Sequence, residues 1–331
     1  MTGFGRLADG REVRRIEISA GALRVGLLDY GARLQEVRLD GLPWSLVLGS
    51  PVLAPYEGRM AYFGALVGPV ANRIAGASAE IAGRRHALCA NEDGVTTLHG
   101  GWLGTHARVW QVAEHGADHA TLTLTLPDGE EGFPGRRRIA AAFRVTAPAA
   151  LEMELTATTD AETHLNLANH AYWRLGPGPD LTGHRLTVAA NRYLPVDARR
   201  LPTGEIRDVT GTPFDFRAGR AVGAEAPQRY DHNLCLADAR RAPAFAARLV
   251  GPGGLRMDLA TTEPGLQIYD AARLDTAPDE GLEGRPEGAF AGLALEPQGW
   301  PDALHRPAFP PTLLRPGETY RQLTRWSFDA G

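Results

Sequence analysis

The chain has 331 residues and a formal net charge of −4, with 44% hydrophobic and 22% charged residues, as expected for a globular protein with a large core. The near-neutral charge, without any basic run, argues against a nucleic-acid partner. All 35 Lys+Arg residues are arginine, which excludes a Schiff-base lysine, the usual pyridoxal phosphate enzymes and a Walker-type phosphate loop.

The first segment, MTGFGRLADGREVRRIEIS, lacks the apolar stretch that a secretory signal needs. No continuous apolar segment is long enough to span a bilayer. We therefore expect a cytoplasmic protein without a membrane partner. The two cysteines, Cys89 and Cys235, have no CxxC spacing, so we expect buried free thiols and no zinc site.

Short alternating segments separated by Gly, Pro, Asp and Asn dominate the chain. Residues 11–39 resemble a helix in places, but their glycine spacing favours strands and turns. Further strands and turns are predicted over 120–132, 151–160, 185–197 and 247–262. No repeat, linker or change in composition divides the chain, so we expect one all-β domain over 1–331, built as a large antiparallel sandwich.

The segment NLANHAYWRLG (166–176) has a histidine among apolar and aromatic residues. In an extended chain, His170 and Tyr172 point to one face, and Leu165 and Leu167 to the other. By itself, His170 fits a structural histidine with satisfied polar atoms as well as an acid–base group.

A glutamate ends the apolar run in LALEPQ, where alternation places Leu293 and Leu295 on one face and Glu296 on the other. A carboxyl group in such a position costs free energy unless it is hydrogen-bonded or used. Its pKa is expected to rise there, which suits a general base. The alternative is a residue at the strand end that reaches solvent.

Several blocks together carry a resemblance to a known family. GPVANRIAG, LHGG, NHAYWRLG, YLPVDARRLPTGEI, YDHN, PGLQIYD and LEPQGWPDA follow one another in this order. Any one block is a weak signal, but the ordered set resembles the aldose 1-epimerase (galactose mutarotase) family from about residue 30 to the C-terminus.

The resemblance implies a large antiparallel β-supersandwich with a sugar site, and interconversion of the α and β anomers of a free aldose without a cofactor or metal. By motif position, Glu296 is the base that removes the O1 proton, and His170 is the acid that protonates the ring oxygen. These roles require His170 to be protonated while Glu296 is ionised, so we expect a bell-shaped pH–rate profile.

The resemblance also implies five sugar-binding residues: Asn72, Arg73, His99, Asp231 and Gln267. Their amide, guanidinium, imidazole and carboxylate groups suit sugar hydroxyls. Simpler roles remain open, because Asp231 could cap a turn, Asn72 and Gln267 could hold backbone, and Arg73 could form a structural ion pair. Tyr172, Trp173 and Trp300 are expected to offer apolar surface to the sugar. His86, His106, His164, His232 and His305 are expected to be surface or scaffold residues.

Two other functions remain open from the sequence: a non-catalytic carbohydrate-binding or sensory module, and a hexose-6-phosphate 1-epimerase. The chain departs from the family pattern at Pro69 and at 270–272 (Asp-Ala-Ala), which puts the substrate range in question. The expected partner is a monosaccharide substrate, and the chain is expected to be a monomer or a homodimer.

Overall fold

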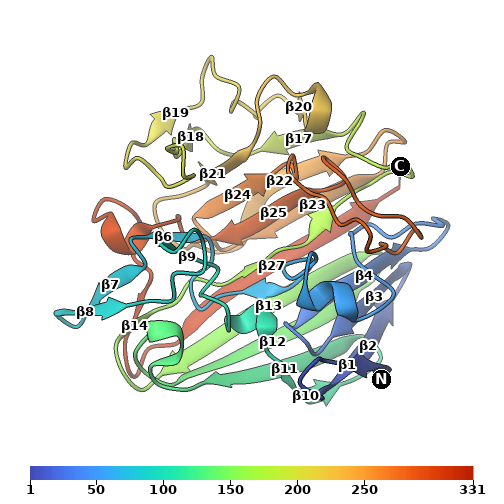
Figure 1. The fold of residues 1–331 in the computed structure, drawn as a ribbon. Coiled ribbons are helices and arrows are strands. Elements are labelled where there is room, and N and C mark those ends of the chain that lie inside the picture. Colours follow the sequence, from blue (N-terminus) through green and yellow to red (C-terminus); the bar gives the residue numbers. More distant parts are fainter. Residues whose placement is uncertain (331) are drawn as a thin grey trace.

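The computed structural model describes residues 1–330, and its regular secondary structure consists almost entirely of antiparallel strands (Figure 1). A four-stranded sheet is formed near the N-terminus by β1 (Thr2–Arg6), β2 (Glu12–Ala20), β3 (Leu23–Leu28) and β4 (Arg33–Leu39). The expected all-β fold is therefore confirmed, including strands rather than a helix over 11–39.

A nine-stranded sheet forms the largest layer. Its strands, in spatial order, are β10 (Gln111–His115), β11 (His119–Leu126), β12 (Arg137–Thr146), β13 (Ala150–Thr159), β27 (Tyr320–Asp329), β23 (Arg256–Thr261), β22 (Ala244–Val250), β17 (Arg185–Val188) and β20 (Arg220–Ala221). Figure 1 shows the red C-terminal strand β27 beside the green strand β13. Pairing of β27 with β13 thus joins the C-terminal strand to the middle of the chain.

A six-stranded sheet carries much of the candidate site. It contains β16 (Tyr172–Trp173), β25 (Leu293–Gln298), β24 (Gly265–Tyr269), β21 (Asp231–Cys235), β18 (Arg192–Tyr193) and β19 (Arg207–Asp208). Four pairs complete the strands: β14 (Thr163–His164) with β26 (Leu313–Leu314), β15 (Ala168–Asn169) with β5 (Leu66–Val67), β6 (Arg73–Ala75) with β9 (Thr96–Leu98), and β7 (Ser78–Ile81) with β8 (Arg84–Ala87). The helical turns are short: η1 (Ala54–Glu57), η2 (Thr105–Ala107), η3 (Glu130–Gly132), η4 (Gly223–Glu225) and η5 (Ala303–His305).

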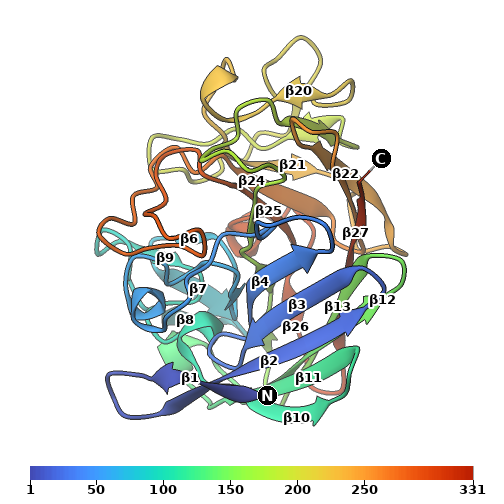
Figure 2. The ribbon, with the colours of Figure 1, turned by 90° about the vertical axis from the view of Figure 1, so that its right-hand side faces the viewer.

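Apolar side chains from the three sheets meet in one large core. Val25 of β3, Phe143 of β12, Trp326 of β27 and Leu295 of β25 are each almost completely buried in it. Figure 2 shows the blue sheet β1–β4 beside the green nine-stranded sheet, where β2 and β3 contact β11 and β12. Burial of alternate residues on these strands provides the driving force for packing the layers together.

The site depends on which strand residues face away from that core. Leu293 and Leu295 of β25 enter the core, as the alternation predicts, so Glu296 faces the other way. The segment 163–173 is not one long strand, because β14, β15 and β16 are separated by irregular residues. His170 lies in the gap between β15 and β16. Within 1–330, none of the helical segments has the length and apolar character needed to traverse a bilayer.

Candidate active site

Strand register places four polar side chains on one face of the six-stranded sheet. Asp231 of β21 is paired with Tyr269 of β24, and Gln267 of β24 is paired with Glu296 of β25. Directly paired residues share a face, and residues two apart on one strand also share it. Asp231, Gln267, Tyr269 and Glu296 therefore lie on the same side of the sheet, although three strands supply them.

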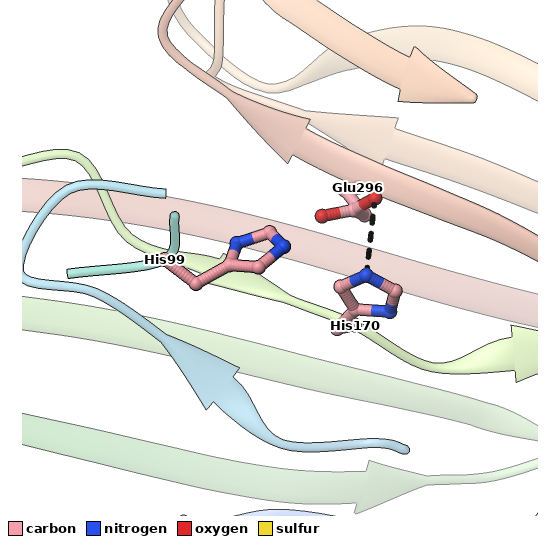
Figure 3. Close-up of side chains that lie close together, drawn as sticks. All are labelled: His99, His170 and Glu296. Atoms are coloured by element: carbon pink, nitrogen blue, oxygen red, sulfur yellow. Dashed lines mark ion pairs between the residues drawn. The ribbon is translucent and has the colours of Figure 1, made fainter. Parts of the chain in front are cut away.

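His170 comes to this face from outside the strands and meets Glu296. Its Nε2 lies 3.7 Å from Oε1 of Glu296, and both side chains are almost completely buried (Figure 3). Nδ1 of His170 and Oε2 of Glu296 make no hydrogen bond within the described chain. The pair is thus shielded from solvent but retains free polar atoms for a bound molecule.

Burial determines the protonation of this pair. It lowers the pKa of His170 to about 4. Burial, reinforced by the negative charge of Asp231, raises the pKa of Glu296 well above its ordinary value. In the free site, burial therefore shifts the two pKa values in directions opposite to those that the proposed acid and base roles require. The neutral histidine with a protonated glutamate is favoured, because a low-polarity site disfavours charge on either partner.

Two residues of the site adopt left-handed backbone conformations and are hydrogen-bonded to each other. Asn72 has φ of 65° and His99 has φ of 51°, values that are uncommon outside glycine. The backbone N–H of Asn72 donates to Nδ1 of His99 at 3.1 Å. Because a backbone N–H can only donate, Nδ1 must be an acceptor, and the ring proton of the neutral imidazole must be on Nε2. Burial, with a smaller effect of the neighbouring His170, lowers the pKa of His99 well below its ordinary value, which keeps the ring neutral.

Tight packing below His99 fixes its loop. Gly100 has φ of 83°, and a Cβ atom at this residue would lie 2.2 Å from the carbonyl oxygen of Gly68. The ring of Pro69 also lies directly against Gly100. Pro69, one of the departures from the family pattern, therefore packs under the LHGG loop.

A charged cluster connects Arg73 with Asp231. Nε and Nη2 of Arg73 each donate to Glu92 at 2.8 Å, in a bidentate pair. Nη1 of Arg73 lies 3.7 Å from Oδ2 of Asp231. Gln267 donates from Nε2 to Oδ1 of Asp231 at 2.7 Å. Gln267 thus holds Asp231 in place, which is an indirect role compared with the sugar contact that the resemblance implies.

These residues surround a cavity of about 150 Å³. Six of the seven predicted site residues line it: Asn72, Arg73, His99, His170, Asp231 and Glu296. The lining also contains Tyr62, Leu98, Tyr172, Arg200 and Tyr269. The volume is below the usual range for drug-sized ligands, roughly 300–1,000 Å³, and suits one small polar molecule.

Sequence reasoning missed Arg200, Glu92 and Tyr62. Arg200 lies in YLPVDARRLPTG, a block that the sequence argument used only for the resemblance. Its Nη2 donates to Oε1 of Glu92 at 3.3 Å, and its Nε lies 3.9 Å from Oδ2 of Asp231. The ring of Tyr62 lies 4.8 Å from that of His99 and 5.9 Å from that of His170. Only the unusual density of arginine in DARR could have drawn attention to Arg200.

Two aromatic residues were wrongly expected in the site. Trp173 is fully buried against Trp326, and Trp300 is buried against Phe309, so neither faces the cavity. Tyr172, in contrast, lines it, with its ring 5.0 Å from that of His170.

The residues expected to lie elsewhere behave mostly as anticipated. His106 and His164 are buried; the ring of His106 lies 4.8 Å from that of Tyr62 in a tilted arrangement, and His164 is hydrogen-bonded to Thr312. The two cysteines are free, but only Cys235 is buried, because Cys89 is partly exposed.

Three potential metal ligands converge in the cavity: His99, His170 and Glu296, with one donor atom of each within 4.8 Å of the others (Figure 3). Two histidines and a carboxylate are a possible ligand set. However, Nε2 of His99 carries the ring proton while Nδ1 accepts the N–H of Asn72. A metal ion would need the Nε2 lone pair, so this arrangement suits donation to an oxygen atom better than metal ligation.

The site therefore combines an imidazole and a carboxyl that can exchange protons with hydrogen-bonding groups around one small molecule. Asp231 and Arg73 can bind hydroxyl groups, and Nε2–H of His99 can donate. The tyrosine rings supply apolar surface beside these polar groups.

Comparison with known proteins agrees with the fold and the motif order. The aldose 1-epimerase family matches residues 14–327. Galactose mutarotase from Rattus norvegicus is 35% identical over 340 residues, covering 99% of this chain and 97% of that protein, and aldose 1-epimerase from Escherichia coli is 33% identical with 97% of each covered. A solved aldose epimerase homologue from C. elegans superposes with a TM-score of 0.89 at 31% identity, covering 96% of this chain and 99% of that one. This chain belongs to the aldose 1-epimerase family.

Proposed function

We propose that this protein is an aldose 1-epimerase, an isomerase that interconverts the α and β anomers of free aldoses such as galactose and glucose. The observation that carries the proposal is the close approach of His170 and Glu296, 3.7 Å apart and buried in the wall of one small cavity. Family membership adds that relatives of similar length are named as mutarotases of this kind.

In the proposed reaction, the Glu296 carboxylate takes the proton from O1 of the pyranose while the His170 imidazolium gives a proton to the ring oxygen. The C1–O5 bond breaks, C1 becomes an aldehyde, and rotation about C1–C2 turns either carbonyl face toward the ring hydroxyl. Closure runs the same transfers in reverse and yields either anomer. No atom is lost or gained, since the same two groups take and return the protons.

The protonation state of the free site fits one stage of this cycle. After ring opening, Glu296 holds a proton and His170 is neutral, which is the state that burial favours. The pair carries one proton in total before and after the transfer. We propose that the cavity thereby stabilises the open-chain intermediate, while the polar hydroxyls of the closed sugar support the charged pair.

The other cavity residues are proposed to hold the ring. Asp231, fixed by Gln267 and Arg73, would accept from sugar hydroxyls. Asn72, beside His99, completes the polar wall, and the Nε2–H of His99 would donate to a sugar oxygen. We further propose that the whole chain acts as one domain, because the residues in question come from positions 72 to 296.

Polarimetry with freshly dissolved α-galactose tests the proposal. The wild-type protein should bring the rotation to equilibrium much faster than buffer alone. Glu296→Gln, which removes the base but keeps the shape, should lose on the order of 10²–10⁴-fold in rate. Glu280→Gln, at an exposed position outside the cavity, is the matched control and should retain the wild-type rate. A folded wild-type protein that leaves the rate at the buffer value would refute the proposal.

A further inference from the structure

A second cavity, of about 190 Å³, lies against the first and shares three of its residues, Arg200, Asp231 and Tyr269. It also contains Asp270, Ala272, Arg229 and Arg273. Two of these residues belong to the 270–272 segment, where the chain departs from the family pattern. We infer that the second cavity is a subsite for an anionic group, a carboxylate or a phosphate ester, attached to the sugar that occupies the first cavity.

Arg200 stands at the boundary between the two cavities. The turn that carries it is fixed by Asp197, whose side chain accepts the backbone N–H groups of Arg199 and Leu201 at 2.8 and 3.0 Å. Arg200 itself has φ of 64°, so the backbone is held in a conformation that directs this one side chain over Asp231. Its Nε is buried and makes no hydrogen bond within residues 1–330. A donor of this kind requires an acceptor, and a bound ligand would supply one.

Arg229 and Asp270 form a fixed pair on the wall of the second cavity. Arg229 donates to the carbonyl oxygens of Gly223 and Ala226, and its guanidinium lies 3.8 Å from Oδ2 of Asp270. Asp270 is fully buried and accepts the backbone N–H groups of Tyr230 and Ala272. These contacts balance the charge of Arg229, so it contributes little net charge to the cavity.

Arg273 provides the uncompensated charge. Its side chain is exposed, lines the second cavity, and has no ion-pair partner in the part of the chain that the structure describes. Arg229 is paired with Asp270, and Arg200 and Arg73 are paired with Glu92 and Asp231, so Arg273 leaves one net positive charge at this cavity. A planar guanidinium is suited to bidentate binding of a carboxylate or phosphate, so the excess charge selects an anion over a neutral group.

This inference rests on the proposed function, because it takes the sugar ring to lie between His170, Glu296 and Asp231. The two cavities meet at Asp231, so a charged exocyclic group can extend past that residue while C1 and O5 remain at the catalytic pair. The predicted substrate class is a free aldose with one anionic substituent, in addition to neutral aldoses.

Binding measured by titration calorimetry at neutral pH and low salt tests the inference independently of turnover. The probes are galacturonate, galactose 6-phosphate and the neutral analogue 6-deoxygalactose. We expect at least one of the two anions to bind about tenfold more tightly than 6-deoxygalactose, which is the fold-change for one charge-assisted hydrogen bond. Whichever of galacturonate and galactose 6-phosphate binds more tightly shows whether the subsite prefers a carboxylate or a phosphate ester. This preference should weaken as salt is added.

A matched pair of variants assigns the effect to the second cavity. Arg273→Met should reduce the anion preference, measured as the ratio of the two dissociation constants, by about tenfold. Arg199→Met, on the same turn as Arg200 but exposed and outside both cavities, should leave that ratio unchanged. An equal loss in both variants would indicate general surface charge and overturn the inference.

Two failures can be told apart. If neither anion binds more tightly than 6-deoxygalactose, the subsite is refuted, whatever the mutarotation rate. If galactose mutarotation stays at the buffer rate, the proposed function is refuted by the polarimetric assay alone. An anion preference lost in Arg273→Met and retained in Arg199→Met supports the subsite in either case.

Discussion

The backbone N–H of Asn72 donates to Nδ1 of His99, and this one contact fixes which nitrogen of the imidazole faces the cavity as a donor. Both residues have positive φ, so the chain accepts two uncommon backbone conformations to form the contact. Strained conformations persist where the surrounding structure holds them, and here Gly100 and Pro69 pack directly against the loop. The contact thus links local backbone geometry to the chemistry of the site.

We predict that His99 is a neutral Nε2–H tautomer throughout the pH range in which the protein is folded. The reasons are the occupied Nδ1 and the burial that lowers its pKa. Two-dimensional ¹H–¹⁵N spectra of labelled protein distinguish the tautomers by the ¹⁵N shifts of the ring, and His99→Asn identifies the signal. A resonance that moves to the imidazolium shifts between pH 8 and pH 5 would contradict this assignment.

We predict that His170 and Glu296 act as one catalytic unit. His170→Asn and Glu296→Gln should each lower kcat by on the order of 10²–10⁴-fold, because each removes one of two coupled proton transfers. The double variant should be little slower than the slower single variant, since the transfers depend on each other. Polarimetry gives the rates, and calorimetric binding of galactose shows that each variant retains a folded cavity. Effects that simply multiply would indicate two independent roles.

The pH–rate profile should have a broad plateau across neutral pH. The pair works with one shared proton, so activity falls only when it gains a second proton or loses the one it has. The pKa of His170 near 4 places the acid limb below neutral pH, and the raised pKa of Glu296 moves the alkaline limb upward. We expect kcat/KM for galactose to vary by no more than about twofold from pH 6 to pH 8. A narrow bell-shaped pH–rate profile centred between pH 6 and pH 8 would contradict this prediction. It would indicate that the resting state is the ion pair of His170 imidazolium and Glu296 carboxylate.

The sequence predicts the strands better than the pocket, and the reason is physical. Leu293 and Leu295 alternate with Glu296, so period-two patterning alone indicates that the carboxyl leaves the core. The role of His170 could be predicted only from the family resemblance, because this residue lies between two short strands, where alternation carries little information. The all-β antiparallel class could therefore be predicted from local patterning, and the proposed catalytic pair only from motif order.

Arg200, Glu92 and Tyr62 could not be predicted because their importance comes from tertiary contacts. Glu92 is noticeable only once Arg73 donates to it with two nitrogens, and Arg200 only once the turn at Asp197 directs it over Asp231. For Trp173, the prediction that its side chain faces the sugar was wrong. Its neighbour Tyr172 faces the cavity, so the same strand alternation that served Glu296 sends Trp173 into the core.

Asp231→Asn should weaken substrate binding more than it slows the chemical step. The change keeps the shape and the contact with Gln267 but removes the charge that faces Arg73 and Arg200. We expect KM for galactose to rise by about tenfold or more, with a smaller change in kcat. Steady-state polarimetry at varied galactose concentration measures both, and Asp238→Asn, an exposed aspartate of the same segment, serves as the control. A fall in kcat with unchanged KM would instead assign Asp231 to the chemical step.

The same variant should also alter the pH profile. The charge of Asp231 is one cause of the raised pKa of Glu296, so its removal should lower that pKa and move the alkaline limb of kcat/KM to lower pH. Comparison of the wild-type and Asp231→Asn profiles on the alkaline side of neutral pH tests this. An alkaline limb that stays in place would show that the Asp231 charge does not act on Glu296.

The buried histidine His164 should make the protein less stable in mild acid. It is hydrogen-bonded to Thr312 at 2.9 Å, and burial lowers its pKa from 6.5 to about 4. Between these pH values the unfolded chain binds the proton that the folded protein refuses, so the stabilisation present above pH 6.5 is lost as the pH falls toward 4. The slope is up to about 1.4 kcal/mol per pH unit for one group. Urea unfolding of wild type and His164→Asn at pH 7, 6 and 5 should show the free-energy difference between them shrinking as the pH falls, and a constant difference would mean that His164 is protonated equally in both states.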